Sequence, residues 1–163
     1  MRSRPAPGRA RGFTLLELLV VVLIIGVMVG LAGVQLMRSP GEIVRDESER
    51  LALLLQAARD EAILQGRVFA FGAGHESYRF LRLERDGKLK IAVDELLRPR
   101  QLPSGVSIES LQVEGAGEGS QPQGVVLLPS GDLPAFRILL AGGGARWSVI
   151  GAPDGTIRAQ AGS

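Results

Sequence analysis

The chain has 163 residues, of which 45% are hydrophobic and 22% are charged. That length suffices for a single domain and excludes a multidomain enzyme, and the composition is that of a folded protein rather than a disordered one. Because the sequence contains no cysteine, disulfides, thiolate metal sites and cysteine nucleophiles are excluded.

The excess of positive charge lies at the N-terminus. Four of the 19 basic residues fall within the first twelve positions, which contain no acidic residue: Arg2, Arg4, Arg9 and Arg11. The rest of the chain then carries 15 basic and 17 acidic residues, a formal net charge of −2. Its charge therefore gives no reason to expect a nucleic-acid partner.

Residues 13–37 form one apolar segment in which only Thr14, Glu17 and Gln35 are polar. As a helix it would be roughly 37 Å long at about 1.5 Å per residue, whereas the hydrocarbon core of a bilayer is about 30 Å thick. A cleavable secretory signal would have a shorter apolar region. The preceding arginines predict a cytoplasmic N-terminus, with the residues beyond 38 on the other side of the membrane.

Glu17 lies near the start of this apolar segment, where an unpaired anion costs about 2.5 kcal/mol or more. We therefore treat Glu17 as a functional candidate; the simpler alternative is that its carboxylate reaches the membrane surface from an anchor helix. Gly26 and Gly30 have the small-xxx-small spacing that permits close helix packing, although glycine is also common in membrane helices.

The string GFTLLE at residues 12–17, followed by an aliphatic run, resembles the type IV prepilin signature. Type IV pilins share this signature with the pseudopilins of type II secretion systems. The resemblance implies that a prepilin peptidase removes the leader, residues 1–12, by cutting after Gly12, and that it methylates the new N-terminal residue, Phe13. It also implies that the N-terminal helix packs against other major and minor pseudopilins in a filament rooted in the inner membrane.

The charges suggest how such assembly could work. Cleavage creates an α-amino cation at Phe13, and Glu17 supplies an anion in the lipid-embedded segment. Pairing Glu17 with the amine of a neighbouring subunit would offset the cost of the buried charge and would fix the axial stagger between subunits.

The second helical segment is predicted to be amphipathic. Val44, Leu51, Leu55, Ala58 and Ala62 form one apolar stripe, and Gly66 is a plausible C-cap. Pro40 is expected to bend the chain without ending the helix. We therefore expect one long helix over about residues 13–65, membrane-borne as far as residue 37 and amphipathic over residues 38–66.

Short strands are predicted for residues 67–163, which would form a β-rich periplasmic head. RVFAFG from Arg67, YRFLRLE from Tyr78 and KLKIAVD from Lys88 suggest a meander with a turn at Asp86-Gly87. A strand near Val106–Val113 precedes residues 115–124, which have the least ordered composition. VVLLP, PAFRILL, RWSVIGA and TIRA, between residues 125 and 159, then suggest a second antiparallel group. The predicted fold is α+β, with the long helix packed on an antiparallel β-sheet head.

This layout extends the resemblance to the minor pseudopilin GspH and the FimT/FimU-type minor pilins. Four strings carry it: AARDEAILQGRVFAF from Ala57, LPSGV from Leu102, LLPSGD from Leu127 and RWSVIGAPDGTIR from Arg146. The head lacks the acidic calcium-binding loop expected of a major pseudopilin.

Few residues offer catalytic chemistry. His75 is the only histidine and lies in the turn-like string GAGHES, and no HExxH, GxSxG or Walker A motif occurs. Asp86, Asp132 and Asp154 each adjoin a glycine in a predicted turn. We therefore expect no enzyme activity, no metal site and no cofactor.

The favoured reading is a minor pseudopilin that joins or primes the tip of a type II secretion pseudopilus. It would be a single-pass inner-membrane protein until assembly, with prepilin peptidase, other pseudopilins and membrane lipid as partners. One alternative is a minor pilin of a type IV pilus, involved in priming or in DNA uptake through Arg79, Arg82 and Arg85. A membrane-anchored periplasmic enzyme is the third.

Overall fold

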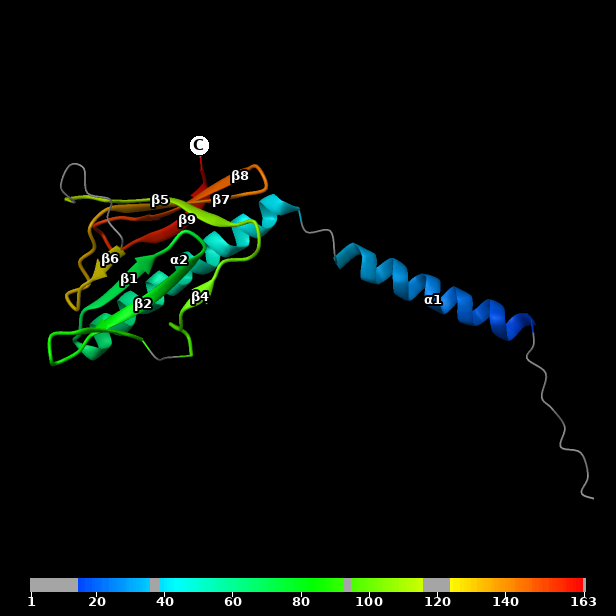
Figure 1. Ribbon diagram of the computed structural model, residues 1–163, viewed down its shortest axis with the longest axis horizontal. Coiled ribbons are helices and arrows are strands. Elements are labelled where there is room, and N and C mark those ends of the chain that lie inside the picture. The colour runs from blue at the N-terminus through cyan, green and yellow to red at the C-terminus, as the bar shows by residue number, and fades with distance from the viewer. Residues whose placement is uncertain (1–14, 36–38, 93–94, 116–123, 163) are drawn as a thin grey trace, which may run out of the picture. The chain divides into compact units, whose positions relative to one another are not determined.

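The computed structural model describes residues 15–35, 39–92, 95–115 and 124–162. The chain divides into two compact units, residues 1–38 and residues 39–163. The first unit contains helix α1 (Leu15–Gln35), and the second contains helix α2 (Pro40–Gln65) and the β-strands (Figure 1).

Helix α1 consists almost entirely of aliphatic residues, and Glu17 lies in its first turn. Its side chains are exposed throughout residues 15–28. Within the described residues, no helix has both the length and the apolar character needed to cross a membrane.

The expected single helix over residues 13–65 is wrong in one respect, because α2 has its own beginning. Ser39 is extended, with φ −63° and ψ 142°. Its Oγ accepts a hydrogen bond from the N–H of Glu42 at 3.3 Å, and the Glu42 carboxylate accepts one from the N–H of Ser39 at 3.0 Å. This capping box satisfies the first donors of the helix. Pro40 is tolerated at the first position, where its missing N–H costs no hydrogen bond.

The predicted apolar stripe of α2 is confirmed. Its five residues, Val44, Leu51, Leu55, Ala58 and Ala62, are fully buried. The predicted C-cap is also confirmed: Gly66 adopts φ 61°, and its N–H donates to the carbonyls of Ala62 and Ile63. The helical period therefore identified the buried face of α2 correctly.

The first sheet contains the predicted meander and two further strands. Its main path has the order β3-β2-β1-β6, all antiparallel, and β4 also pairs with β2. The bounds are β1 Phe69–Ala73, β2 Ser77–Leu83, β3 Leu89–Ile91, β4 Arg100–Gln101 and β6 Gly124–Leu127. The two-residue strand β4 was not predicted from the sequence.

The second sheet has the order β5-β7-β8-β9, again antiparallel. The bounds are β5 Ser107–Val113, β7 Phe136–Gly142, β8 Ala145–Gly151 and β9 Ile157–Ala161. Gly143 and Gly144, with φ of 56° and 81°, form the two-residue turn between β7 and β8, and such turns require positive φ at both positions.

One sheet assignment is corrected. The VVLLP strand was expected beside the C-terminal strands, but β6 pairs with β1 of the first sheet. Its inward residues Val125 and Leu127 are fully buried and extend the apolar inner face that begins with Phe69 and Phe71. Most of residues 115–124, predicted to be the least ordered, lie outside the described residues.

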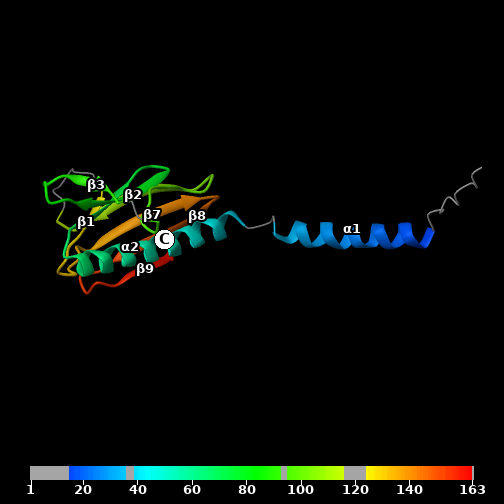
Figure 2. The ribbon, with the colours of Figure 1, turned by 90° about the horizontal axis from the view of Figure 1, so that it is seen from below.

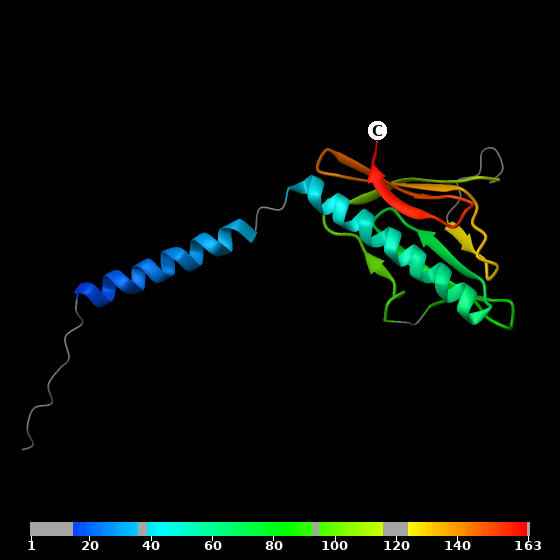
Figure 3. The ribbon, with the colours of Figure 1, turned by 180° about the vertical axis from the view of Figure 1, so that it is seen from behind.

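The core lies where α2 meets both sheets (Figures 2 and 3). The first sheet contributes mainly aromatic side chains, and the second contributes mainly aliphatic ones. The buried side chains include Phe69, Phe71, Tyr78 and Phe80 from the first sheet and Phe136, Ile138, Leu140, Val149 and Ile157 from the second, where Phe136 is the one aromatic among these. Helix α2 runs beside β9, and this arrangement leaves one face of each sheet turned away from the helix.

Candidate functional site

The predicted processing residues, Gly12 and Phe13, lie outside the described residues. Glu17 is described, and it occupies the first turn of α1, where the helix dipole favours a negative charge. Gly26 and Gly30 both belong to α1, and a Cβ added at Gly26 would meet no atom within 4 Å. The surface of α1 at Gly26 is thus open to close approach by another helix.

A buried polar contact joins α2 to the first sheet. The Tyr78 hydroxyl donates to Oε1 of Glu47 at 2.9 Å, and Arg50 Nη1 lies 3.4 Å from Oε2. Glu47 is only 4% exposed and Tyr78 only 2%. Burial, followed by the proximity of the Glu47 carboxylate, raises the pKa of Tyr78, since both disfavour a phenolate. The phenol therefore stays protonated and holds β2 against the helix.

This contact was not predicted from the sequence, although the sequence contains a signal for it. Glu47 follows Val44 by three residues and precedes Leu51 by four, so it belongs to the apolar stripe of α2. A charged residue on such a stripe needs a polar partner within the core.

Two further contacts join α2 to the second sheet and its turns. Gln56 Nε2 donates to the carbonyl of Ile157 at 2.6 Å, and Arg59 Nε donates to the carbonyl of Gly131 at 3.0 Å. Gly155, with φ +86°, packs so closely that an added Cβ would lie 2.3 Å from Arg59 Nη2. Arg59 thus brings together the AARDEA, LLPSGD and APDG strings.

The outer face of the first sheet is apolar. Its register aligns four residues from four strands, which we call the apolar row: Val126, Ala70, Leu81 and Ile91. Ile91 is 47% exposed and Val126 is 48% exposed. A neighbouring pair, Leu83 and Leu89, extends the same face.

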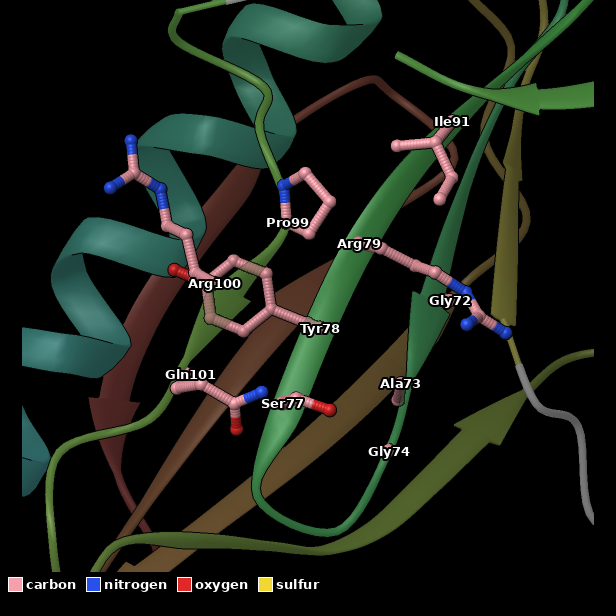
Figure 4. A pocket seen from close by; sticks show the side chains of 10 residues that line it. All are labelled: Gly72, Ala73, Gly74, Ser77, Tyr78, Arg79, Ile91, Pro99, Arg100 and Gln101. Atoms are coloured by element: carbon pink, nitrogen blue, oxygen red, sulfur yellow. The ribbon is translucent and has the colours of Figure 1, made fainter. Parts of the chain in front are cut away.

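A pocket of about 300 Å³ opens beside the apolar row, at the edge of β2 between β3 and β4 (Figure 4). Ile91 belongs to both the row and the pocket. Its polar lining residues are Ser77, Tyr78, Arg79, Arg100 and Gln101, while Gly72 and Gly74 contribute backbone surface. The Arg79 side chain runs from β2 across Gly72 (Figure 4).

The three arginines considered for DNA contact do not share one surface. Arg79 is exposed on the outer face of β2. Arg82, three residues further along the strand, is on the opposite face of the sheet, and its Nη2 lies 2.6 Å from Glu84 Oε1. The Arg82 guanidinium lowers the pKa of Glu84. Arg85 is exposed in the following turn. The ion pair neutralises Arg82, so this region of the head presents no three-arginine patch.

The remaining candidates serve turns. His75 is exposed in the β1–β2 turn, where its carbonyl accepts a hydrogen bond from Ile108. Asp154 Oδ1 accepts a hydrogen bond from the N–H of Thr156 at 2.8 Å, which lowers the pKa of Asp154. Asp86 likewise accepts from the N–H of Lys88. Within the described ranges, no group of three or more His, Cys, Asp or Glu residues could hold a metal ion.

An aliphatic N-terminal helix with an acid in its first turn, followed by an amphipathic helix on an antiparallel β head, defines a pilin-like protein. The family model described as "Type II transport protein GspH" matches residues 47–155, and the "Prokaryotic N-terminal methylation motif" matches residues 8–33. The chain therefore belongs to the GspH family.

Known proteins agree with this assignment. Type II secretion system protein H of Pseudomonas aeruginosa is 34% identical over 143 residues, which cover 81% of this chain and 83% of that protein. The crystal structure of the minor pseudopilin EpsH from the type II secretion system of Vibrio cholerae has a TM-score of 0.63 at 21% identity, covering 76% of this chain and 96% of that one. The type IV minor pilin FimU of P. aeruginosa has a TM-score of 0.52 at 16% identity, with coverages of 74% and 88%.

Proposed function

We propose that the chain is a minor pseudopilin, a structural subunit that joins or forms the tip of a type II secretion pseudopilus. The observation that carries this proposal is the match to the GspH family over residues 47–155, together with the methylation motif over residues 8–33. The expected role is mechanical, through contacts between subunits during protein export. No step of it requires chemistry by the head.

Processing is the first step of the proposal. Prepilin peptidase would cut between Gly12 and Phe13 and methylate Phe13, which leaves residues 13–163 as the mature chain. A Gly12→Leu variant should keep its leader and fail to assemble, whereas the matched leader variant Gly8→Leu should be cleaved normally. Mass spectrometry of the protein from its own cells distinguishes the two forms. Cleavage at any other bond would contradict the assignment.

Residues 13–37 are proposed to anchor the chain in the inner membrane until assembly, with residues 67–163 as a periplasmic head. The four arginines ahead of this segment support that orientation. A reporter enzyme that is active only in the periplasm should be active when fused to the C-terminus, and one that is active only in the cytoplasm should not be. An active cytoplasmic reporter at that position would reverse the topology.

Glu17 is proposed to pair with the N-terminal amine of a neighbouring subunit during assembly. Glu17→Gln should leave cleavage normal and reduce incorporation into pseudopili by about tenfold or more, because an ion pair in an apolar environment is lost. Glu17→Asp, which retains the charge, is the matched control and should assemble better than Glu17→Gln. Equal incorporation of Glu17→Gln and the unaltered chain would remove the charge-pairing step.

The alternative, a minor pilin of a type IV pilus, shares the fold, as the likeness to FimU shows. Deletion of the gene separates the two functions. A pseudopilin deletion should abolish export of type II substrates and leave pilus-dependent motility and DNA uptake unchanged. The reverse result would favour the pilus.

A further inference from the structure

We propose that the outer face of the first sheet is a docking surface for the head of a different prepilin-type subunit, one that presents an apolar surface and a carboxylate that pairs with Arg79. This inference rests on the proposed function. It adds the face of the head that carries the contact and the chemistry of the partner.

The apolar row forms the centre of this surface. Because Ala70 pairs with both Val126 and Leu81, and Leu81 pairs with Ile91, the four side chains follow one another across the sheet. Leu89, on the adjacent pair, is 53% exposed. A solvated face of an antiparallel sheet normally carries polar residues, and contiguous exposed apolar patches mark interaction sites.

The second sheet shows that an apolar outer face is not a general property of this head. Its corresponding row, also across four strands, is largely polar: Gln112, Arg137, Ile150 and Arg158. Three of these residues are exposed. The apolar character is therefore confined to one of two faces that the same chain turns away from α2.

Arg79 gives the surface its charge. Of the described strand residues that alternate to this outer face it is the only charged one, since Arg100 pairs with the inward-facing Tyr78. The next pairing positions beside Arg79 are Gly72 and Gly124. With no side chain on Gly72, the Arg79 stem lies flat, so that its Cγ and Nε are each 3.6 Å from where a Cβ would be. The Arg79 side chain extends across β1 at Gly72 (Figure 4), and a guanidinium can form two hydrogen bonds to one carboxylate.

The charge pattern selects the occupant. A second copy docked face to face would bring another Arg79 and no acid from the described part of this surface. An anionic lipid surface attracts clusters of basic residues, whereas this face offers one. A different subunit with an acid beside an apolar surface satisfies both the row and the guanidinium, in keeping with the apolar, arginine-enriched centres of protein interfaces.

The test places a photoreactive phenylalanine analogue at position 91 or 126 of the full-length chain in its own cells. Position 112, on the outer face of the second sheet, is the matched control. Irradiation at 91 or 126 should link the chain to the head of one other prepilin-type subunit, identified by sequencing the linked peptide, and position 112 should not yield that peptide. Linkage to a second copy, linkage to lipid only, or no linkage overturns the proposal.

Charge reversal tests the chemistry of the contact. Arg79→Glu should lower the yield of the linked product by about tenfold or more, and Arg137→Glu, an exposed strand arginine of the second sheet, should leave it unchanged. When the acidic residue of the linked partner is replaced by lysine, the Arg79→Glu chain should again give the full yield of linked product. An unchanged yield with Arg79→Glu overturns the role of Arg79.

The two levels of proposal fail differently. A chain that is not cleaved before Phe13 contradicts the pseudopilin function itself. A chain that is cleaved and incorporated, yet forms no link from position 91 or 126, leaves that function standing and overturns the docking surface alone.

Discussion

The two sheets of the head both bury an apolar inner face, and their outer faces differ in polarity. Phe71 and Phe80 of the first sheet and Ile138 and Leu140 of the second are all buried in the core shared with α2. Outward, the first sheet carries the apolar row and the second carries a row with two arginines. Side chains alternate between the two faces of each strand. The residues on the inner face therefore stabilise the core, and those on the outer face can differ between the sheets without changing the fold.

The largest effects should come from the inner faces. Phe80→Ala is expected to lower the free energy of unfolding by about 3–5 kcal/mol, and Leu140→Ala by about 2–5 kcal/mol, because each leaves a cavity in the core. Chemical denaturation of the protein in mild detergent, followed by the fluorescence of Trp147, measures both. A loss below about 1 kcal/mol for either residue would show that the two inner faces do not contribute alike.

Loss of the Tyr78–Glu47 contact should have the next largest effect on the free energy of unfolding. Tyr78→Phe removes the donor and leaves the buried Glu47 carboxylate without it, which should cost about 1–3 kcal/mol. Glu47→Gln is the matched variant, since its amide oxygen can still accept the hydrogen bond, and it should cost less. An equal or larger loss for Glu47→Gln would assign the stability to the charge of Glu47 rather than to the hydrogen bond.

The same tyrosine predicts a response to alkali. Because burial raises the pKa of Tyr78 in the folded protein above its ordinary value of about 10, the folded state binds that proton more tightly than the unfolded state. The stabilisation is complete below pH 10 and declines as the pH rises through the folded pKa. Denaturation midpoints at alkaline pH should fall more steeply for the unaltered protein than for Tyr78→Phe. Parallel curves would contradict the assigned shift.

At the contact between α2 and the second sheet, Gln56→Ala removes the hydrogen bond to the Ile157 carbonyl and should lower the free energy of unfolding by about 0.5–1.5 kcal/mol. Gln65→Ala is the control, because Gln65 is exposed at the end of α2, and it should cost less than about 0.5 kcal/mol. Equal losses would mean that Gln56 does not hold β9 to the helix.

The smallest effect on stability is expected on the outer face of the first sheet. Ile91→Thr and Val126→Thr should each change the free energy of unfolding by no more than about 0.5 kcal/mol, since both side chains are about half exposed and threonine suits a strand. A loss above about 1 kcal/mol would show that the chain itself covers these residues, and the docking surface would then not be free.

Much of this fold could be predicted from periodicity. The spacing of Val44, Leu51 and Leu55 identified the buried face of α2, and glycine identified the C-cap at Gly66. These features depend on residues close in sequence, where the helical and strand repeats act directly. The candidate site at residues 12–17 was identified by its resemblance to a known signature.

The features that were not predicted correctly depend on contacts or combinations of side chains that hydrophobic periodicity does not reveal. The strand at Val125 is a short apolar run that suits either sheet, and only the pairing with Phe71 across a long connection decides between them. Pro40 alone predicts a bend in a continuous helix, whereas the Ser39 and Glu42 side chains form a capping box that begins a separate helix there. Tyr78 and Glu47 are 31 positions apart, a separation at which no sequence repeat reveals a contact.

The capping box at Ser39 has a consequence for the independence of the head. Ser39 and Glu42, which satisfy the first donors of α2, both belong to the unit of residues 39–163. This unit therefore does not need a preceding helical turn for α2 to begin. We expect a fragment starting at Ser39 to fold and remain monomeric in plain buffer. The same autonomy means that the fold of residues 39–163 should not depend on what surrounds the N-terminal helix.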